Sequence, residues 1–305
     1  MSFSSSLKKE ICQNRPFIYP KKRAVCFGML LFGRNFEEGT ICLHTENRQV
    51  AKLYSSLIYQ LVEIRTSITV TEQITRDERK LFIVTVDSLE DRRAVQQYFA
   101  PLYQKFLECD PGQERDLEFL HGVLCGAFLS CANISDPQKS YHLEFVAHHA
   151  LADQSLGVLL QKLSIRYNHT TRKGARLLYV KSSEAIEDVL TMLGAGNTAL
   201  EVMNVKIYKD MRNKVNRITN CETANIDKTV TAAAAQIGKI RLIERQVGIE
   251  SLPPGLREVA RLRLQNPDMP LSELAQALHP PLSRSGVNYR LRQLCAMADE
   301  LQNKK

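Results

Sequence analysis

The 305-residue sequence lacks the features that mark membrane-spanning and exported proteins. No uninterrupted apolar run reaches the roughly 18 residues that a bilayer-spanning helix needs, and the mean hydropathy is −0.23. The N-terminal stretch MSFSSSLKKEICQNRP carries charge but no apolar core of signal-peptide length. We therefore expect a soluble, cytoplasmic protein that has no membrane partner.

Motifs for metals and cofactors are also missing. The eight cysteines include no C-x-x-C pair, which leaves a zinc site without support. No phosphate-binding or dinucleotide-binding glycine pattern occurs. His142, His148 and His149 cluster on and after a predicted strand, but alternation sends neighbouring side chains to opposite faces, so we interpret them as surface or groove-lining residues. We expect no cofactor, no metal and no catalytic residue.

Positive charge is concentrated in the last third of the chain. Residues 1–204 hold 24 Lys and Arg against 23 Asp and Glu, whereas residues 205–305 hold 17 against 10. Such a surplus favours an anionic polymer, with nucleic acid as the first choice, as the partner of the C-terminal part. A basic tail on an ordinary domain is the alternative.

The first two hundred residues contain an internal repeat. Residues 21–102 and 116–195 both predict the order α-β-β-α-β-β-α, and Gly28 and Gly126 lie 98 residues apart inside the two opening helices. The predicted elements of the first copy are 23–32, 40–45, 48–62, 67–71, 80–86 and 88–99, with Ser88 as the cap of the last helix. Those of the second copy are 117–131, 141–147, 153–163, 167–171, 176–180 and 183–193. Chance recurrence of helices and strands in an α+β domain is the alternative.

Two such copies can form a saddle whose opening helices pack together at a pseudo-twofold axis. Gly28, Gly126 and Ala127 would allow those helices to approach closely. This arrangement resembles the LAGLIDADG homing-endonuclease fold, with CFGMLLFGR (26–34) and LCGAFLSCA (124–132) where its signature helices lie. The resemblance implies a DNA-sized groove.

The same resemblance argues against DNA cleavage. In the endonucleases a carboxylate near the end of each signature helix binds the divalent metals that phosphodiester hydrolysis requires. Gly33 and Cys131 stand at those positions, and neither can replace a carboxylate. The nearest acids, Glu37, Glu38 and Asp136, fall in the turns that follow. We interpret the fold as kept and the nuclease activity as lost.

A basic connector follows the repeats. Five cations within twelve residues face one acid, Asp210, and we predict that they contact phosphates: Lys206, Lys209, Arg212, Lys214 and Arg217. An alanine-rich stretch then predicts a helix of about four turns from Glu222 to near Gly238. A linker helix with ordinary surface charge is the alternative.

The last fifty residues predict three short helices. The first begins at Pro253-Pro254 and stops at Asn266, the second is capped by Ser272, and the third is capped by Ser283 and runs to about Leu301. A tight break before the last helix matches a helix-turn-helix domain. A small helical bundle with a basic, solvated face is the alternative.

The third helix divides into an apolar and a polar side. At 100° per residue one stripe collects Val287, Leu291, Leu294, Ala298 and Leu301, which we expect to face the core. A helix that enters the major groove meets base edges mainly with its first turns, where Arg can bond guanine and Asn adenine. The predicted DNA-binding residues are Ser283, Arg284, Ser285, Asn288, Tyr289, Arg290 and Arg292.

Together these segments resemble the WhiA family of bacterial regulators over nearly the whole chain. The similarity is carried by SFSSSLKKEI, SDPQKSYHLEFV, KDMRNKVNRITNCETANIDKTV, LPPGLREVARLRLQNPDMPLSELAQAL and PPLSRSGVNYRLRQL. It implies a degenerate homing-endonuclease domain joined to a helix-turn-helix that resembles sigma-factor region four. It further implies a DNA-binding protein tied to cell division, chromosome segregation and, in spore-formers, sporulation.

We thus expect an α+β fold, with a two-lobed LAGLIDADG-like αββαββα repeat followed by an all-α helix-turn-helix domain. The predicted divisions are an N-terminal segment 1–20, repeats 21–102 and 116–200 joined by a linker 103–115, a connector 201–250 and the helix-turn-helix domain 251–305. The predicted function is a non-enzymatic, sequence-specific DNA-binding regulator on the nucleoid, with double-stranded DNA as partner and a second regulatory protein as a further partner of the two-lobed domain. A Mg²⁺-dependent nuclease with relocated carboxylates, or a protein-interaction module that the basic arm localises to DNA, are the alternatives.

Overall fold

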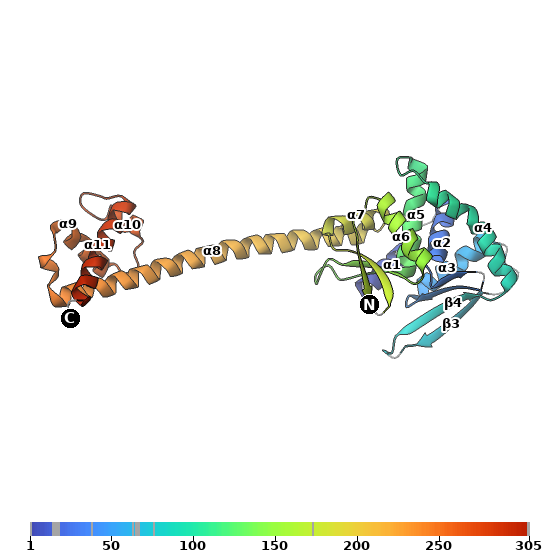
Figure 1. Ribbon diagram of the computed structural model, residues 1–305, viewed down its shortest axis with the longest axis horizontal. Coiled ribbons are helices and arrows are strands. Elements are labelled where there is room, and N and C mark those ends of the chain that lie inside the picture. The colour runs from blue at the N-terminus through green and yellow to red at the C-terminus, as the bar shows by residue number, and fades with distance from the viewer. Residues whose placement is uncertain are drawn as a thin grey trace. The chain divides into compact units, whose positions relative to one another are not determined.

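The structure is a computed structural model, and it describes residues 2–13, 19–37, 39–62, 64, 68–75, 77–172 and 174–303. The chain divides into two compact units, Met1–Lys209 and Asp210–Lys305. The first unit holds both sheets, and the second consists of helices (Figure 1). None of the described helices is long and apolar enough to cross a membrane.

Both copies of the repeat have the predicted order of elements. After helix α1 (Phe3–Gln13), the first copy consists of α2 (Tyr19–Leu31), β1 (Asn35–Glu37), β2 (Thr40–Thr45), α3 (Arg48–Leu61), β3 (Ile68–Ile74), β4 (Lys80–Val86) and α4 (Leu89–Glu108). The second copy consists of α5 (Glu114–Cys131), β5 (Ala132–Ile134), β6 (Leu143–Ala147), α6 (Ala150–Lys162), β7 (Asn168–Arg172), β8 (Ala175–Val180) and α7 (Ser183–Met192). Ser67, which was predicted to begin a strand, and the turn residue Glu38 lie outside the described residues.

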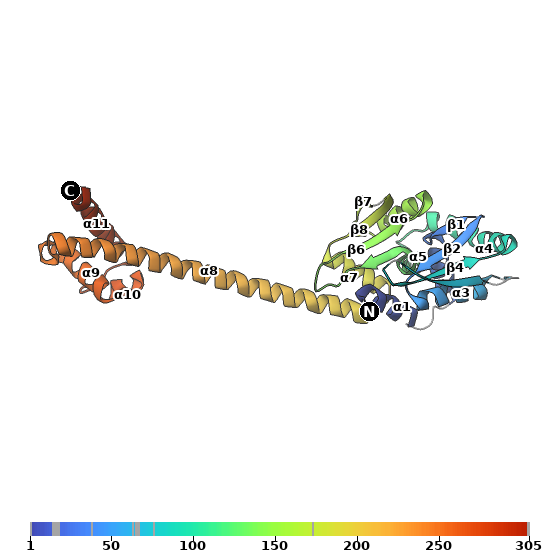
Figure 2. The same ribbon diagram turned by 90° about the horizontal axis from the view of Figure 1, so that it is seen from below.

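The two copies build the same sheet twice. Each sheet is antiparallel and four-stranded, with the order β1-β2-β4-β3 in the first and β5-β6-β8-β7 in the second (Figure 2). The registers pair Leu43 with Val84 and Phe145 with Leu178, and these four side chains are fully buried. They lie on the faces that α3 and α6 cover. Because side chains alternate along a strand, each sheet has an opposite side, which we call its polar face; His44 lies on that of the first sheet.

The opening helices α2 and α5 pack directly against each other in the centre of this unit (Figure 1). A Cβ atom on Gly28 would lie 2.4 Å from the Val123 carbonyl oxygen, and one on Gly126 would lie 2.3 Å from the Val25 carbonyl oxygen. No side chain fits in either place. The predicted close approach of the two helices at these glycines is therefore confirmed.

Helix α4 is longer than predicted. Ser88 does cap it, since its hydroxyl accepts a hydrogen bond from the Asp91 N–H at 3.0 Å. The helix does not end near Phe99 but continues through Pro101 to Glu108. Leu102 and Phe106 extend its apolar stripe into the core, and their burial offsets the hydrogen bond that the proline removes. Much of the predicted linker 103–115 is therefore helix.

The connector is one helix, α8 (Gly196–Gln246), and not the four-turn helix that was predicted. Its sequence contains no proline, and Gly238 alone costs only about 1 kcal/mol relative to alanine. Beyond that glycine, Ile240 and Ile243 are fully buried in the core of the second unit. This burial carries the helix past the predicted stop.

The second unit is completed by a short turn and three helices. After the 3₁₀ turn η1 (Ile249–Ser251) come α9 (Pro254–Gln265), α10 (Leu271–Gln276) and α11 (Arg284–Asn303). Leu274, Ala275 and Leu278 are buried in the core of this unit. Ser272, however, does not cap α10: the helix begins one residue before it, with Pro270 at the cap position and no capping side chain.

Candidate nucleic-acid interface

The first turn of α11 is fixed by a serine cap. The Ser283 hydroxyl accepts a hydrogen bond from the Gly286 N–H at 3.1 Å, and the Ser283 carbonyl accepts one from Val287. Ser283 Oγ also lies 2.9 Å from Ser285 Oγ. The cap predicted from the sequence is confirmed. Because it uses the Gly286 N–H, this group is not free for a phosphate.

The predicted division of α11 into two sides is present. Val287, Leu291, Leu294 and Ala298 are fully buried, and Leu301 packs at the edge of the same core. On the other side Tyr289 is 64% exposed, and its hydroxyl accepts a hydrogen bond from the Gln293 amide. Ser285 and Arg292 are exposed and Asn288 is half-buried.

Arg284 and Arg292 are the cations that this polar side offers. Both are exposed, and neither forms a hydrogen bond or ion pair within the described part of the chain. Asn288 lies one helical turn from each of them and is likewise without a side-chain hydrogen bond among the described residues. Two arginines and one amide on the first three turns of a helix are the side-chain types that hydrogen-bond guanine and adenine edges.

Arg290, another predicted DNA-binding residue, has a partner inside its own domain. Its guanidinium donates a hydrogen bond to the Gly255 carbonyl oxygen at 3.3 Å, at the start of α9, and the side chain is half-buried there. Gly255 has no side chain and so leaves room for the guanidinium, since a Cβ at that position would lie 3.3 Å from the guanidinium carbon. Arg290 therefore holds α11 to α9, and its hydrogen-bonding is directed into the domain.

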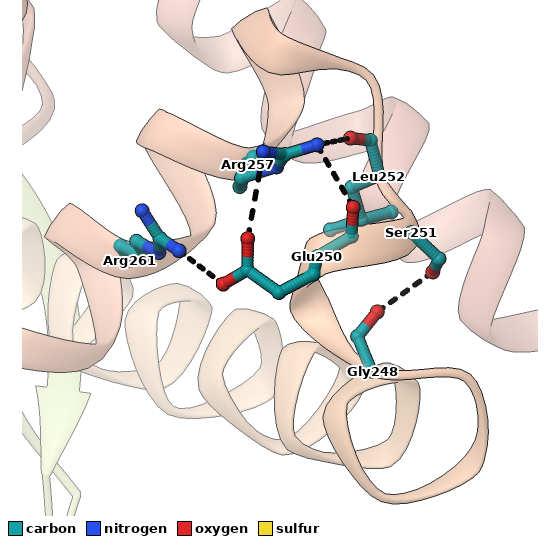
Figure 3. A network of polar contacts seen from close by, with 6 residues as sticks. All are labelled: Gly248, Glu250, Ser251, Leu252, Arg257 and Arg261. Atoms are coloured by element: carbon teal, nitrogen blue, oxygen red, sulfur yellow. Dashed lines mark hydrogen bonds and ion pairs between the residues drawn. The ribbon is translucent and has the colours of Figure 1, made fainter.

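A polar network ties the 3₁₀ turn η1 to α9 (Figure 3). Arg257 donates hydrogen bonds to the carbonyl oxygens of Glu250 at 2.8 Å and Leu252 at 3.1 Å, and its guanidinium also pairs with the Glu250 carboxylate. Arg261 donates to the other oxygen of that carboxylate. One acid thus partners two of the arginines of α9. Their charge is partly neutralised inside the domain, in contrast to that of Arg284 and Arg292.

A buried arginine holds the turn between α9 and α10. Only 1% of Arg263 is exposed, and burial lowers its pKa. Its guanidinium donates to the carbonyl oxygens of Asn266, Pro267 and Met269, the last at 2.7 Å. These carbonyls belong to the turn that sets the angle between the two helices. The sequence analysis did not single out this residue, because a basic residue on a helix with other basic residues is expected to be exposed at the surface.

The predicted phosphate-contacting residues of the connector fall into two groups. Lys206 pairs with Glu184 at 2.6 Å and Glu187 at 3.6 Å. Lys209 donates to the Pro137 carbonyl at 2.7 Å, and its ammonium lies 4.7 Å from the centre of the Tyr141 ring. Both lysines are therefore engaged with the second repeat. The other three, Arg212, Lys214 and Arg217, are exposed and have no ion pair among the described residues.

The ends of the two opening helices carry cations where a nuclease needs carboxylates. At the end of α5 the Lys8 ammonium donates to the Leu129 carbonyl at 3.1 Å. Burial lowers the pKa of Lys8 to about 8 and raises that of the adjacent Cys131 to about 12, so this thiol stays protonated at neutral pH. Gly33 follows α2, and Arg34 comes directly after it. Within the described ranges, no three His, Cys, Asp or Glu side chains meet in a way that could hold a metal ion.

The three clustered histidines have separate surroundings. His142 lies 3.4 Å from the Glu144 carboxylate, which also pairs with Arg172 at 3.1 Å on the polar face of the second sheet. His149 caps α6 by accepting a hydrogen bond from the Ala152 N–H. His148 accepts one from Arg34 of the first repeat.

Comparison with known proteins identifies the family. A sequence profile described as the WhiA LAGLIDADG-like domain matches residues 120–212, and one described as the WhiA C-terminal HTH domain matches residues 215–298. The probable cell division protein WhiA of Clostridium novyi (strain NT) is 36% identical over 99% of this chain and 99% of its own length. The chain belongs to the WhiA family. The probable cell division protein WhiA of Clostridium tetani (strain Massachusetts / E88) is 34% identical over 99% of this chain and 98% of its own.

The fold is shared with a solved WhiA structure. Full-length DUF199/WhiA from Thermatoga maritima covers 98% of this chain and 99% of its own, with a TM-score of 0.55 and 23% sequence identity. The predicted family and the predicted α+β fold, with two LAGLIDADG-like lobes and a C-terminal helix-turn-helix, are thus confirmed. The cations at the helix ends were missed, although the 98-residue spacing of the repeat could have drawn attention to Arg34, since Ala132 is its counterpart in the second copy.

Proposed function

We propose that this WhiA-family protein is a sequence-specific regulator that binds double-stranded DNA with α11 and does not cleave it. The observation that carries the proposal is the contrast among the arginines of the second unit. Arg257, Arg261, Arg263 and Arg290 are all engaged by groups of their own domain, whereas Arg284 and Arg292 are exposed and without a partner among the described residues. Unpaired cations on the first turns of such a helix suit the edges of bases in the major groove.

In this proposal the connector supplies affinity without sequence information. Arg212, Lys214 and Arg217 follow one another on the exposed part of α8, where they can approach phosphates. Ser283, Ser285 and Tyr289 border the reading side and would contact the backbone. The biological role that we propose is transcriptional control linked to cell division and chromosome segregation, with the protein on the nucleoid and, in spore-formers, a part in sporulation.

Absence of nuclease activity is part of the same proposal. Metal-assisted phosphodiester cleavage needs hard oxygen ligands that hold the ion between the attacking and leaving oxygens. Glycine and a buried, protonated thiol stand at the two helix ends, and the Lys8 ammonium lies beside one of them. The positive charge of Lys8 would repel a divalent metal ion at this helix end. Supercoiled plasmid incubated with the protein and Mg²⁺ should therefore remain supercoiled, and nicking that depends on the metal would contradict this part of the proposal.

Base reading by Arg292 is tested by comparing two kinds of DNA. Selection from a random duplex library first supplies a preferred site, and binding is then measured on that site and on random duplex. Arg292→Ala should weaken binding to the preferred site by roughly 5-fold to 150-fold, the equivalent of ~1–3 kcal/mol, and should change binding to random duplex far less. Arg245→Ala, which removes another exposed arginine of the same unit, is the matched control.

Equal losses on the two duplexes would show that Arg292 contacts only phosphate. No preferred site in the selection would contradict sequence-specific binding altogether. A genome-wide crosslinking map of the native protein then tests the regulatory role, since bound sites should lie at promoters of division and segregation genes.

Docking of a second protein on the two-lobed unit is the other candidate function. It is favoured by the near-balance of charge in residues 1–204, because a groove that follows a length of DNA would carry a clear excess of Lys and Arg, whereas a contact with a single phosphate needs no such excess. A partner captured equally well by native protein and by Arg284→Ala/Arg292→Ala would support this function, because the DNA-reading side is then not needed.

A further inference from the structure

Arg34 and His148, from different repeats, are in contact in the first unit, and His44 lies near enough for the charge of Arg34 to act on it. Arg34 lies in the turn between α2 and β1, His44 on β2, and His148 between β6 and α6. Arg34 Nη1 is 2.9 Å from His148 Nδ1, which is a contact between residues 114 apart in sequence. Arg34 and His148 are exposed, and His44 is half-exposed. The cluster is therefore open to a ligand from solvent.

The contact between Arg34 and His148 fixes the tautomer of the imidazole. A guanidinium can only donate hydrogen bonds, so His148 Nδ1 accepts and its proton must be on Nε2. Although His148 is exposed, neighbouring groups shield part of its ring from water, and this partial burial together with the charge of Arg34 lowers its pKa to about 4; the same two causes lower the pKa of His44. At neutral pH the cluster thus presents one permanent cation and two neutral imidazoles, and His148 Nε2–H is a donor without a partner among the described residues.

Among the described residues, the charge of Arg34 is not neutralised by an ion pair. No carboxylate pairs with Arg34 in the described part of the chain, and Glu37 acts on the neighbouring His149 instead. The counterpart of Arg34 in the second repeat is the buried Ala132, beside a helix end that Lys8 already closes. The two helix ends thus differ in the groups beside them: a lysine contacts the end of α5, whereas an arginine and two histidines lie near the end of α2.

We propose that Arg34, His44 and His148 form a seat for one phosphate group, and that a backbone phosphate of bound DNA occupies it. The remaining N–H groups of a planar guanidinium match the oxygens of a phosphate, and hydrogen bonds between charged partners are about twice as strong as neutral ones. Arginine and imidazole N–H groups can bind phosphate oxygens directly, so this site requires no metal ion. The choice of DNA as the source of the phosphate rests on the function proposed above.

The seat itself is tested with inorganic phosphate and the full chain. Histidine ring resonances of ¹⁵N-labelled protein are followed during a phosphate titration at constant ionic strength, with His148→Gln and His44→Gln supplying the assignments. Both rings should shift and saturate together. Arg34→Ala should weaken the titration at least fivefold, whereas Arg115→Ala, which removes an exposed arginine from the start of α5, should leave it unchanged.

The source of the phosphate is tested with duplex DNA. The slope of log K against log salt falls by about 0.9 for each phosphate contact that is removed from B-form DNA. Arg34→Ala should make this negative slope shallower by about one unit, both on a preferred site and on random duplex. Arg115→Ala should leave it as in the native protein.

The outcomes separate the two proposals. If phosphate binding is saturable but Arg34→Ala leaves the salt dependence of DNA binding unchanged, the site binds free phosphate. That result would overturn DNA as the ligand. Ring resonances that do not respond to phosphate, or respond equally in Arg34→Ala, would overturn the seat. A protein that binds no duplex at all would contradict the proposed function, and the phosphate titration would still decide the seat.

Discussion

Gly28 and Gly126 face each other across the contact between α2 and α5: a Cβ on Gly28 would lie 3.1 Å from the Cα atom of Gly126. The two residues occupy the same place in the two repeats, 98 residues apart. The opening helices thus meet backbone to backbone, and this contact joins the two repeats. Substituting either glycine tests how far the fold depends on it.

Gly126→Ala should destabilise the first unit severely. The new methyl group would lie 2.3 Å from the Val25 carbonyl oxygen and 2.6 Å from the Met29 nitrogen, and both are backbone atoms that cannot turn away. We expect a loss of more than about 3 kcal/mol, at the upper end of what overpacking costs, or failure to accumulate folded protein. Thermal unfolding followed by circular dichroism measures it.

Gly238→Ala is the matched control for this substitution. It also replaces a helical glycine, but no atom lies within 4 Å of the added methyl group. A gain of roughly 0.5–1 kcal/mol is expected, because alanine has the higher helix propensity. If Gly126→Ala unfolded at the same temperature as the native protein, α2 and α5 could not be packed this closely.

Arg263→Met should loosen the turn between α9 and α10. Methionine fills the space of the aliphatic chain but leaves the carbonyls of Asn266, Pro267 and Met269 without their donor. We expect a loss of about 1–3 kcal/mol, the cost of leaving such groups unsatisfied. Hydrogen exchange read by mass spectrometry should show faster exchange in α9 and α10 and little change in the first unit.

Arg261→Met provides the comparison on the same helix. Its ion pair with Glu250 is exposed on both sides, and exposed pairs contribute little to stability. Exchange in α9 and α10 should stay close to that of the native protein. A response as large as that of Arg263→Met would mean that any loss of positive charge from α9 loosens the domain, which contradicts a specific role of the buried guanidinium.

Neutralising the connector should change the salt dependence of DNA binding in a position-dependent manner. Replacing Arg212, Lys214 and Arg217 with alanine should make the negative slope of log K against log salt shallower by up to about 3 units, because each phosphate contact contributes about 0.9. Replacing Lys206 and Lys209 should change the slope much less, since Glu184 and Pro137 already engage them. Fluorescence anisotropy of a labelled duplex over a range of salt concentrations measures both.

An equal fall in slope for the two sets would show that the lysines leave their partners when DNA binds. An unchanged slope for the first set would exclude α8 from the phosphate footprint. Circular dichroism of each variant serves as the check that α8 remains helical, because alanine at an exposed helical position favours the helix.

Local patterns in the sequence predicted most of the elements, because apolar spacing and caps are properties of neighbouring residues. Ser88 and Ser283 cap their helices as expected, and Val287 and Leu291 face the core. The errors arose where distant packing decides. The length of α8 depends on the burial of Ile243 in another helix's core, which no local signal reports.

Side-chain partners were harder to predict than elements. Arg290 and Arg292 are two residues apart and look alike in the sequence, yet one donates to the Gly255 carbonyl and the other is exposed. The partner of Arg290 lies 35 residues away, at the start of a helix whose placement only the folded domain defines. The contact of Arg34 with His148 is of the same kind, since it joins two repeats.

Lys8→Met should remove a pH-dependent contribution to stability. The pKa of Lys8 is about 8 in the folded protein against 10.5 for an ordinary lysine, chiefly because of burial. Between these values the unfolded chain binds more protons, so the native protein gains stability as pH rises through this window. From pH 7 to 9.5 the free energy of unfolding of the native protein should rise by up to about 2 kcal/mol relative to that of Lys8→Met, at about 1.4 kcal/mol per pKa unit.

Urea unfolding at several pH values measures the difference between the two proteins. Cys12 and Cys131, whose pKa values burial raises, oppose the gain above pH 9, but they are present in both proteins and largely cancel in the difference. Lys9→Met removes a lysine from the same helix without touching the Leu129 carbonyl, and its curve should stay parallel to the native one. A native protein and a Lys8→Met variant with parallel curves would mean that the Lys8 ammonium is solvated. The contact of Lys8 with the Leu129 carbonyl at the end of α5 would then be contradicted.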